Sequence, residues 1–243
     1  MEKIYKLVDE IYCINLISRL DRYNLMKNFE KEEKIKITFY RPEKDASSGM
    51  IGCFKSHIEV IKKAYESGKE RVLIFEDDII KTFHYNKVDY DEMSNFIKND
   101  DQWEILQLSW FDIITCLYLN LQPKYKNISE FSSVLASSYI LNRNGMKRIL
   151  DSYKNYIGKI PIDIYYYKIF NKKMFNIVPI IFDQDRNLVT DNIWINKTID
   201  NILIYIHKTF NIVYLISLCK FYNIFYILLI IIISIFIWKK YIN

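Results

Sequence analysis

The stretch that decides the fold is RVLIFEDD, residues 71–78. Its four consecutive apolar residues, 72–75, predict a short strand buried on both faces, because such a strand shows a continuous apolar run and not an alternating one. The carboxylates Glu76, Asp77 and Asp78 follow directly. Adjacent acids repel one another and gain nothing from burial, so we expect them at the carboxyl end of the strand, where open α/β sheets place their ligands.

The acidic triplet has the chemistry of a divalent-cation site. In an extended chain Glu76 and Asp78 lie on one side and Asp77 on the other, so one face offers oxygen ligands for Mg2+ or Mn2+. A hard cation held by so few carboxylates completes its shell with water and substrate phosphates, which favours a diphosphate-bearing substrate. The alternative is an acidic turn that is merely solvated, since short acidic clusters are common.

Composition bounds the class of protein. The chain has 243 residues, 51% hydrophobic and 16% aromatic, which predicts a domain with a sizeable core. Lys and Arg exceed Asp and Glu by 34 to 29, and this mild, dispersed excess suits an anionic ligand but predicts no nucleic-acid partner. The four cysteines show neither zinc-site spacing nor a disulfide framework, so we interpret them as reduced thiols.

Strand-like and helix-like segments alternate along the chain. Strands are expected at 11–16, 35–40, 71–75, 103–110, 134–141 and 174–181. Helices are expected from Ser18, as a capping-box start, over 50–68 with a stop at Gly68, over 89–98, over 145–156 with Asn144 as the cap, and after Asp163. This order predicts an α/β domain with a largely parallel sheet, with residues 1–200 as the catalytic domain.

Three further residues, Arg19, Arg22 and His57, are candidates for ligand binding on the basis of their positions in the expected helices. Arg19 and Arg22 fall in the first turn of an expected helix, where two guanidiniums beside free N–H groups suit a phosphate. The alternative is a pair of solvated surface arginines. His57 lies beside the buried stripe of the second helix, where a structural, hydrogen-bonded histidine is the alternative to a ligand.

Five motifs occur in an order that resembles glycosyltransferase family 25, which includes bacterial lipooligosaccharide glycosyltransferases and procollagen galactosyltransferases. They are INL at 14–16 with two arginines behind it, GCFKSH at 52–57, LIFEDD at 73–78, YILNRNGMKRIL at 139–150 and PID at 161–163. The resemblance covers residues 11–193, and the combination of GCxxSH with EDD is far more specific than either piece.

The resemblance implies a GT-A fold, a nucleotide-sugar donor that is usually UDP-galactose, a divalent metal, and inversion at the anomeric carbon. The acceptor would be a glycan, a glycolipid or a protein. By resemblance the metal ligands are Asp78 and Glu76, and the donor-binding residues are Asn15, Arg19, Arg22, Ser56 and Asp77. Gly145 matches the glycine that opens a later helix.

Inverting transfer needs a base that takes the proton from the acceptor hydroxyl. Asp163, which matches an acidic residue on the acceptor side of the family, is the first hypothesis and His57 the second. The alternative for Asp163 is a helix N-cap after Pro161.

One departure from the family leaves other functions open. Only RPEKDASSG, residues 41–49, separates the second expected strand from GCFKSH, whereas the family usually has a longer stretch there. A degenerate domain that serves as a binding or scaffold protein at a membrane is therefore the alternative to an enzyme. A metal-dependent phosphohydrolase would use the same acids with water as the acceptor.

The last part of the sequence predicts a membrane anchor. Residues 221–238 carry no charge over 18 positions, about 27 Å as a helix at roughly 1.5 Å per residue, close to the ~30 Å bilayer core. Residues 201–220 suit an interfacial helix. The chain starts with MEKIYKLVDE, which lacks the apolar core of a signal peptide, so we expect a single-pass anchor with the catalytic domain in the cytosol. A buried core helix is the alternative.

Overall fold

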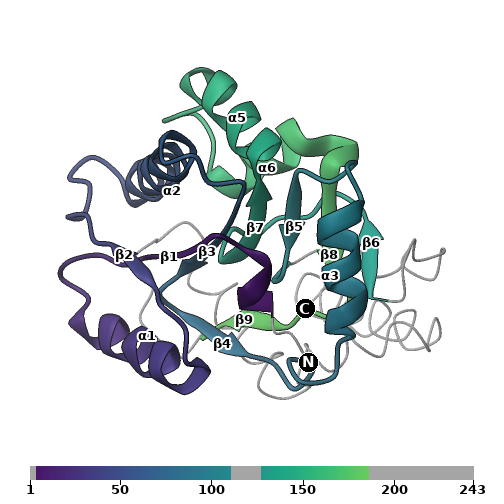
Figure 1. Ribbon diagram of the computed structural model, residues 1–243. Coiled ribbons are helices and arrows are strands. Elements are labelled where there is room, and N and C mark those ends of the chain that lie inside the picture. The colour runs from purple at the N-terminus through teal and green to yellow at the C-terminus, as the bar shows by residue number, and fades with distance from the viewer. Residues whose placement is uncertain (1–3, 111–126, 186–243) are drawn as a thin grey trace, which may run out of the picture.

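The computed structural model describes residues 4–110 and 127–185 (Figure 1). In it the apolar run becomes strand β3 (Arg71–Glu76), and the side chains of residues 72–75 are completely buried. Val72 and Ile74 face one helical layer, whereas Leu73 and Phe75 face the other. The expectation of a strand covered on both faces is therefore confirmed.

Seven strands form one sheet in the order β2-β1-β3-β7-β5-β8-β6. Besides β3 they are β1 (Glu10–Ile14), β2 (Thr38–Tyr40), β5 (Ile105–Gln107), β6 (Ile128–Glu130), β7 (Ser138–Asn142) and β8 (Met174–Ile177). Strand β1 pairs in parallel with β2 and β3, and β5 pairs in parallel with β8. Strand β7 is antiparallel to β3 and β5, and β6 is antiparallel to β8.

The sheet is thus mostly parallel in strand direction, with β6 and β7 reversed. This mixed α/β arrangement fits a GT-A-like fold. The reversal of β7 in the middle of the sheet was not expected. A run of buried apolar residues gives the same pattern in a parallel and in an antiparallel strand, so the sequence of β7 does not show in which direction the strand runs.

Helices cover both faces of the sheet (Figure 1). One layer consists of α2 (Gly49–Glu66), α5 (Arg143–Ser152) and α6 (Ile162–Phe170). The other contains α1 (Leu20–Glu33), α3 (Tyr90–Asn99) and the 3-10 helix η1 (Ile4–Leu7). Two further 3-10 turns, η2 (Tyr153–Asn155) and η3 (Asn171–Lys173), follow α5 and α6.

Two predicted helix caps are wrong and one helix end is confirmed. Arg19, not Ser18, is the N-cap of α1, and its side chain makes no capping hydrogen bond. Asn142, not Asn144, caps α5, because its side chain accepts a hydrogen bond from the Gly145 N–H at 2.8 Å. Helix α2 stops before Gly68, whose φ of +74° is the left-handed conformation that glycine tolerates.

Three short strands were not expected. Strand β6 falls between the strands expected at 103–110 and 134–141, where no element was expected. Strand β4 (Ile79–Lys81) directly follows the acidic triplet and pairs with β9 (Phe182–Gln184) as an antiparallel ribbon. The strand expected over 134–141 begins only at Ser138, after Leu135, whose φ of 110° is incompatible with an extended strand. The three-residue strands β2 and β5 were expected because they lie within longer patterned runs, 35–40 and 103–110, whereas no such run was found around β4, β6 or β9.

Within the two described ranges, no helix combines the length and apolar character needed to cross a bilayer. The predicted membrane helix at 221–238 and the interfacial segment at 201–220 lie outside the described residues.

Candidate active site

The acidic triplet lies at the edge of the sheet where β1 and β3 end. These strands run in parallel, and their register pairs Ile14 with Glu76. One residue beyond each strand, the Asn15 side-chain amide donates a hydrogen bond to the Asp77 carboxylate at 2.7 Å. Residues distant in sequence therefore meet at the carboxyl edge of the sheet, as expected for the ligand site of an open α/β fold.

Arg22 of α1 is 7% exposed and binds two of the acids. Its Nη1 donates to Asp77 Oδ1 at 2.8 Å and to Asp78 Oδ2 at 3.3 Å. Because the chain turns at residues 77–78, the alternation expected of an extended chain ends at Glu76. The buried Asp78 Oδ1 has no hydrogen-bond partner among the described residues.

The electrostatics single out Asp78 among the three acids. Burial, together with the negative charge of Glu76, raises the pKa of Asp78 to about 7, and Arg22 offsets only part of this. Burial also raises the pKa of Asp77, although hydrogen bonds from Arg22 and Asn15 oppose the shift. Asp78 is thus the carboxylate whose ionised form is least compensated by its neighbours.

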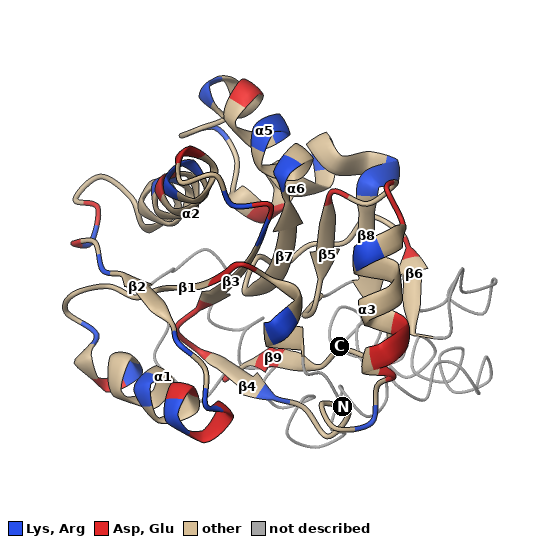
Figure 2. Cartoon of the chain, in the orientation of Figure 1, with Lys and Arg blue, Asp and Glu red and all other residues tan. Residues whose placement is uncertain are grey.

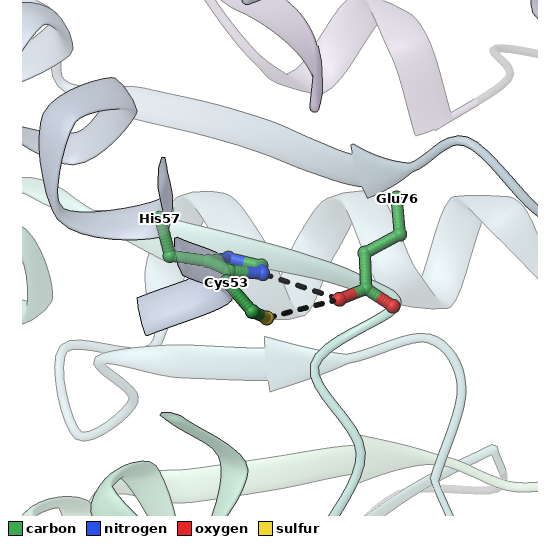
Figure 3. A group of neighbouring side chains, drawn as sticks. All are labelled: Cys53, His57 and Glu76. Atoms are coloured by element: carbon green, nitrogen blue, oxygen red, sulfur yellow. Dashed lines mark hydrogen bonds and ion pairs between the residues drawn. The ribbon is translucent and has the colours of Figure 1, made fainter. Parts of the chain in front are cut away.

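Glu76 turns to the opposite side, toward α2. The alternation of β3 places it on the same face as Val72 and Ile74, and there His57 Nε2 lies 3.4 Å from Glu76 Oε1. The Cys53 thiol donates to the same oxygen at 3.7 Å (Figure 3). Burial raises the pKa of Glu76, but the contact with His57, the hydrogen bond from Cys53 and the charge of Arg22 together lower the pKa overall.

His57 is completely buried, and both of its ring nitrogens have partners. On the side opposite Glu76, its Nδ1 lies 2.6 Å from the Tyr139 hydroxyl, which in turn lies 3.0 Å from the Tyr166 hydroxyl. Gln184 of β9 donates to Glu76 Oε2 at 3.0 Å. Sequence reasoning missed Tyr139, and it also missed Gln184, which lies beyond the last expected strand, 174–181.

An open pocket joins these groups. It is lined by all three acids, Arg22 and Gln184, and on the α2 side by Cys53 and Ser56. The short loop before α2 contributes Lys44 and Asp45 to the same wall. The Ser56 hydroxyl donates to the Gly52 carbonyl at 2.7 Å, so it is satisfied within the helix.

Gly52 in the GCFKSH motif has a steric explanation. A Cβ at position 52 would lie 2.8 Å from Asp45 Cβ, closer than two such atoms approach in real structures. Asp45 itself is held by Lys55 at 2.7 Å. Glycine therefore lets the loop close against α2 and form part of the pocket wall.

Four predicted residues do not line the pocket. Asn15 and His57 contact its acids from buried positions, whereas no hydrogen bond within the described residues joins Arg19 or Asp163 to them. The Arg19 guanidinium pairs with Asp21 at 2.8 Å and does not line the pocket, although its carbonyl accepts a hydrogen bond from Asn15. Asp163 lies in the first turn of α6, whose N-cap is Pro161, so the N-cap alternative for Asp163 is wrong. Its carboxylate accepts from the Ile164 N–H at 2.8 Å, and burial and the charge of Glu76 raise its pKa.

The residues present fit a hard divalent cation at Asp78, because a buried carboxylate oxygen there has no donor among the described residues. The triplet does not itself converge. Within the described ranges, Cys53, His57 and Glu76 are the one group of three ligand atoms that lie within 4.8 Å of one another. Glu76 is therefore shared between the acidic edge and the α2 side.

Comparison with protein families yields a match over residues 32–166, more than half of the chain, to glycosyltransferase family 25, described as an LPS biosynthesis protein. The chain belongs to glycosyltransferase family 25. The match to this family covers Cys53, His57, the three acids and Asp163. Asn15, Arg22 and Gln184 lie outside the matched range, yet they contact the same acids.

Two solved structures resemble this family 25 chain. The crystal structure of A197 from STIV is 10% identical with a TM-score of 0.45, covering 69% of this chain and 81% of that one. A glycosyltransferase involved in the glycosylation of the major capsid of PBCV-1 is 12% identical with a TM-score of 0.34, covering 70% and 94%. Both TM-scores are below 0.5, so neither likeness supports a functional argument. No curated protein matches the chain.

Proposed function

We propose that this protein transfers a sugar, galactose in the first instance, from a UDP-sugar to an acceptor hydroxyl on a glycan, glycolipid or protein, with inversion at the anomeric carbon. Family membership supports sugar transfer in general. The observation that carries the finer proposal is the buried Asp78 carboxylate oxygen beside Arg22, which has no hydrogen-bond partner in residues 4–110 and 127–185 and lies in a pocket at the carboxyl edge of β1 and β3. Such an oxygen suits a cation that also binds a diphosphate.

Asp78 would hold Mn2+ or Mg2+, which when bound would neutralise the charge that develops on the departing diphosphate. Glu76, the second ligand implied by the resemblance, faces Cys53 and His57 and would reach this ion only after its side chain rotates. The protein itself supplies the rest of the donor site. Arg22 and Asn15 orient Asp77, and Arg22 also holds Asp78 in place. Lys44 adds a positive charge to the pocket wall, which favours an anionic donor. Arg and Lys are otherwise scattered over helices of both layers, mixed with Asp and Glu (Figure 2).

Asp163 is proposed as the base that takes the proton from the acceptor hydroxyl. Its raised pKa, caused by burial and Glu76, moves it toward the range in which a carboxylate accepts a proton readily. His57 is a poorer choice, because it is completely buried and both of its nitrogens already have partners. We assign His57 instead to the positioning of Glu76.

Calorimetric titration of UDP into the full-length protein, with Mn2+ and then with EDTA, tests the donor site. We expect binding that depends on Mn2+ and is lost in Asp78→Asn. The matched control is Asp151→Asn on the exposed face of α5, where the carboxylate pairs with Lys147. Binding that persists in EDTA, or that survives in Asp78→Asn, would contradict the metal assignment. No binding under any condition would favour the degenerate scaffold.

Membrane association is proposed from the sequence alone. The uncharged residues 221–238 have the length of a bilayer-spanning helix. We expect the protein to remain in the membrane fraction after alkaline carbonate treatment. Its release by carbonate would show that these residues do not span the bilayer.

A further inference from the structure

Cys53, His57 and Glu76 gather ligand atoms of three kinds at one point (Figure 3). Cys53 and His57 are four residues apart on α2, so they project from the same face of the helix. Glu76 reaches this face from the end of β3. A thiol sulfur, an imidazole nitrogen and a carboxylate oxygen thus converge from two rigid elements and not from a loop.

We propose that these three side chains form a site for a borderline-soft divalent cation, Zn2+ by preference, with a fourth coordination position that opens into the pocket. A thiolate with an imidazole selects Zn2+ over Mg2+ or Mn2+, which prefer oxygen ligands. The site therefore differs in metal preference from the one at Asp78. The existence of this site does not depend on the proposed sugar transfer.

The distances suit tetrahedral zinc. With Zn–S of ~2.3 Å and Zn–N or Zn–O of ~2.0–2.1 Å, the ligand atoms around a tetrahedral ion lie roughly 3.3–3.6 Å apart. Here Glu76 Oε1 lies 3.4 Å from His57 Nε2 and 3.7 Å from Cys53 Sγ. All three atoms lie within 4.8 Å of one another, so only small side-chain shifts are needed to enclose an ion.

The surroundings of His57 support a ligand role. Metal-binding histidines usually hydrogen-bond through their other ring nitrogen, which fixes the tautomer and the ring orientation. The Nδ1 of His57 lies 2.6 Å from the Tyr139 hydroxyl, and Tyr139 is held in turn by Tyr166. When a cation is bound, an Nδ1–H that donates to Tyr139 would direct the Nε2 lone pair at the ion, in place of the Nε2 contact with Glu76 in the metal-free protein.

The position of the site explains where the fourth ligand enters. Cys53 and Glu76 both line the open pocket, whereas His57 is completely buried behind them. Three protein ligands with one open position are typical of zinc sites that exchange water or a substrate group. A bound ion would also engage Glu76 Oε1, so it would compete with the cation at Asp78 for this carboxylate. This last consequence rests on the proposed function.

Cobalt spectroscopy tests the site without any donor or transfer assay. The full-length protein is reduced, freed of metal with EDTA, desalted and titrated with Co2+. We expect one equivalent to produce a thiolate-to-cobalt absorption band in the near ultraviolet and strong visible bands of tetrahedral Co2+. Zn2+ should abolish both sets of bands at one equivalent, whereas Mg2+ in large excess should not.

Substitutions test whether Cys53, His57 and Glu76 are the metal ligands. Cys53→Ser should lose the thiolate band, while Cys116→Ser, which removes a different thiol, should retain it. Tyr139→Phe keeps all three ligands but removes the partner of His57, and we expect Co2+ affinity to fall by about 10–100-fold. Circular dichroism checks that each variant is folded. The inference is overturned if the wild type shows no such bands, if the thiolate band persists in Cys53→Ser, or if the Co2+ affinity of Tyr139→Phe is unchanged. If Cys53→Ser fails to fold, Tyr139→Phe and Cys116→Ser decide the question.

Discussion

Replacing Asp78 by Asn should stabilise the metal-free protein at alkaline pH while it destroys donor binding. The Asp78 carboxyl has its pKa raised from 3.8 to about 7 by burial and by Glu76. A shift of about three pKa units at ~1.36 kcal/mol each corresponds to roughly 4 kcal/mol of unfavourable free energy when the buried group is ionised. Asn has nearly the same shape and carries no charge, so it removes this cost.

The sign follows from proton linkage. The folded protein holds the Asp78 proton more tightly than the unfolded chain does, so this group destabilises the fold as the pH rises from about 4 to about 7, and the full cost remains above that range. Asn also forms a weaker contact with Arg22 than the carboxylate does, and this loss should cancel about 1–2 kcal/mol of the stability gained by removing the charge. The expected net gain at pH 8 is about 2 kcal/mol, or roughly 4–8 °C in Tm for a chain of this size.

Thermal unfolding followed by circular dichroism, in EDTA at pH 8 and at pH 4, measures this effect. At pH 4 the wild-type carboxyl is protonated in the folded state, so the two proteins should differ little. Asp151→Asn, which removes an exposed carboxylate, should change stability by less than about 0.5 kcal/mol at either pH. A lower Tm for Asp78→Asn at pH 8, or an equal gain at pH 4, would refute the electrostatic reasoning. Added Mn2+ should then stabilise the wild type and leave Asp78→Asn unchanged.

Three further substitutions test the site and its support. Gly52→Ala places a Cβ 2.8 Å from Asp45 Cβ, so we expect a loss of about 1–3 kcal/mol in urea denaturation and weaker UDP binding as the loop moves away. Gly145→Ala places a Cβ 2.2 Å from the backbone oxygen of Glu104, which cannot rotate aside, so its loss in the same assay should exceed that of Gly52→Ala, and the opposite order would contradict the steric argument. Asp163→Asn should bind UDP normally but transfer sugar about 10²–10⁴-fold more slowly, and full activity would exclude it as the base.

Local patterns were enough to predict the elements that build the acidic edge. The continuous apolar run of β3, the periodic apolar face of α2 and the stop at Gly68 are all encoded within a few consecutive residues. The same holds for the position of the acids, because a carboxylate that follows a buried strand must emerge at its end. Strands β4, β6 and β9 could not be found this way, because they lie outside the longer patterned runs that revealed β2 and β5, and their pairing comes from partners far along the chain.

Arg19 and Arg22 illustrate where sequence reasoning ends. Both were expected beside a phosphate, but Arg19 is the N-cap and its guanidinium pairs with Asp21, whereas Arg22 is buried against Asp77 and Asp78. Spacing alone does not distinguish them, since it cannot show which side of α1 faces the end of β3.

By itself, the sequence determined that a strand buried on both faces ends in three acids, and that Cys53 and His57, four residues apart, share one face of the helix before that strand, because helical and extended geometry are local properties. Only the tertiary structure decided that Glu76 meets Cys53 and His57 while Asp78 meets Arg22. The reason is physical: β3 continues its alternation through Glu76 and then turns, so neighbouring carboxylates face different elements. The division of one acidic run between two sites is therefore a property of packing and not of the motif.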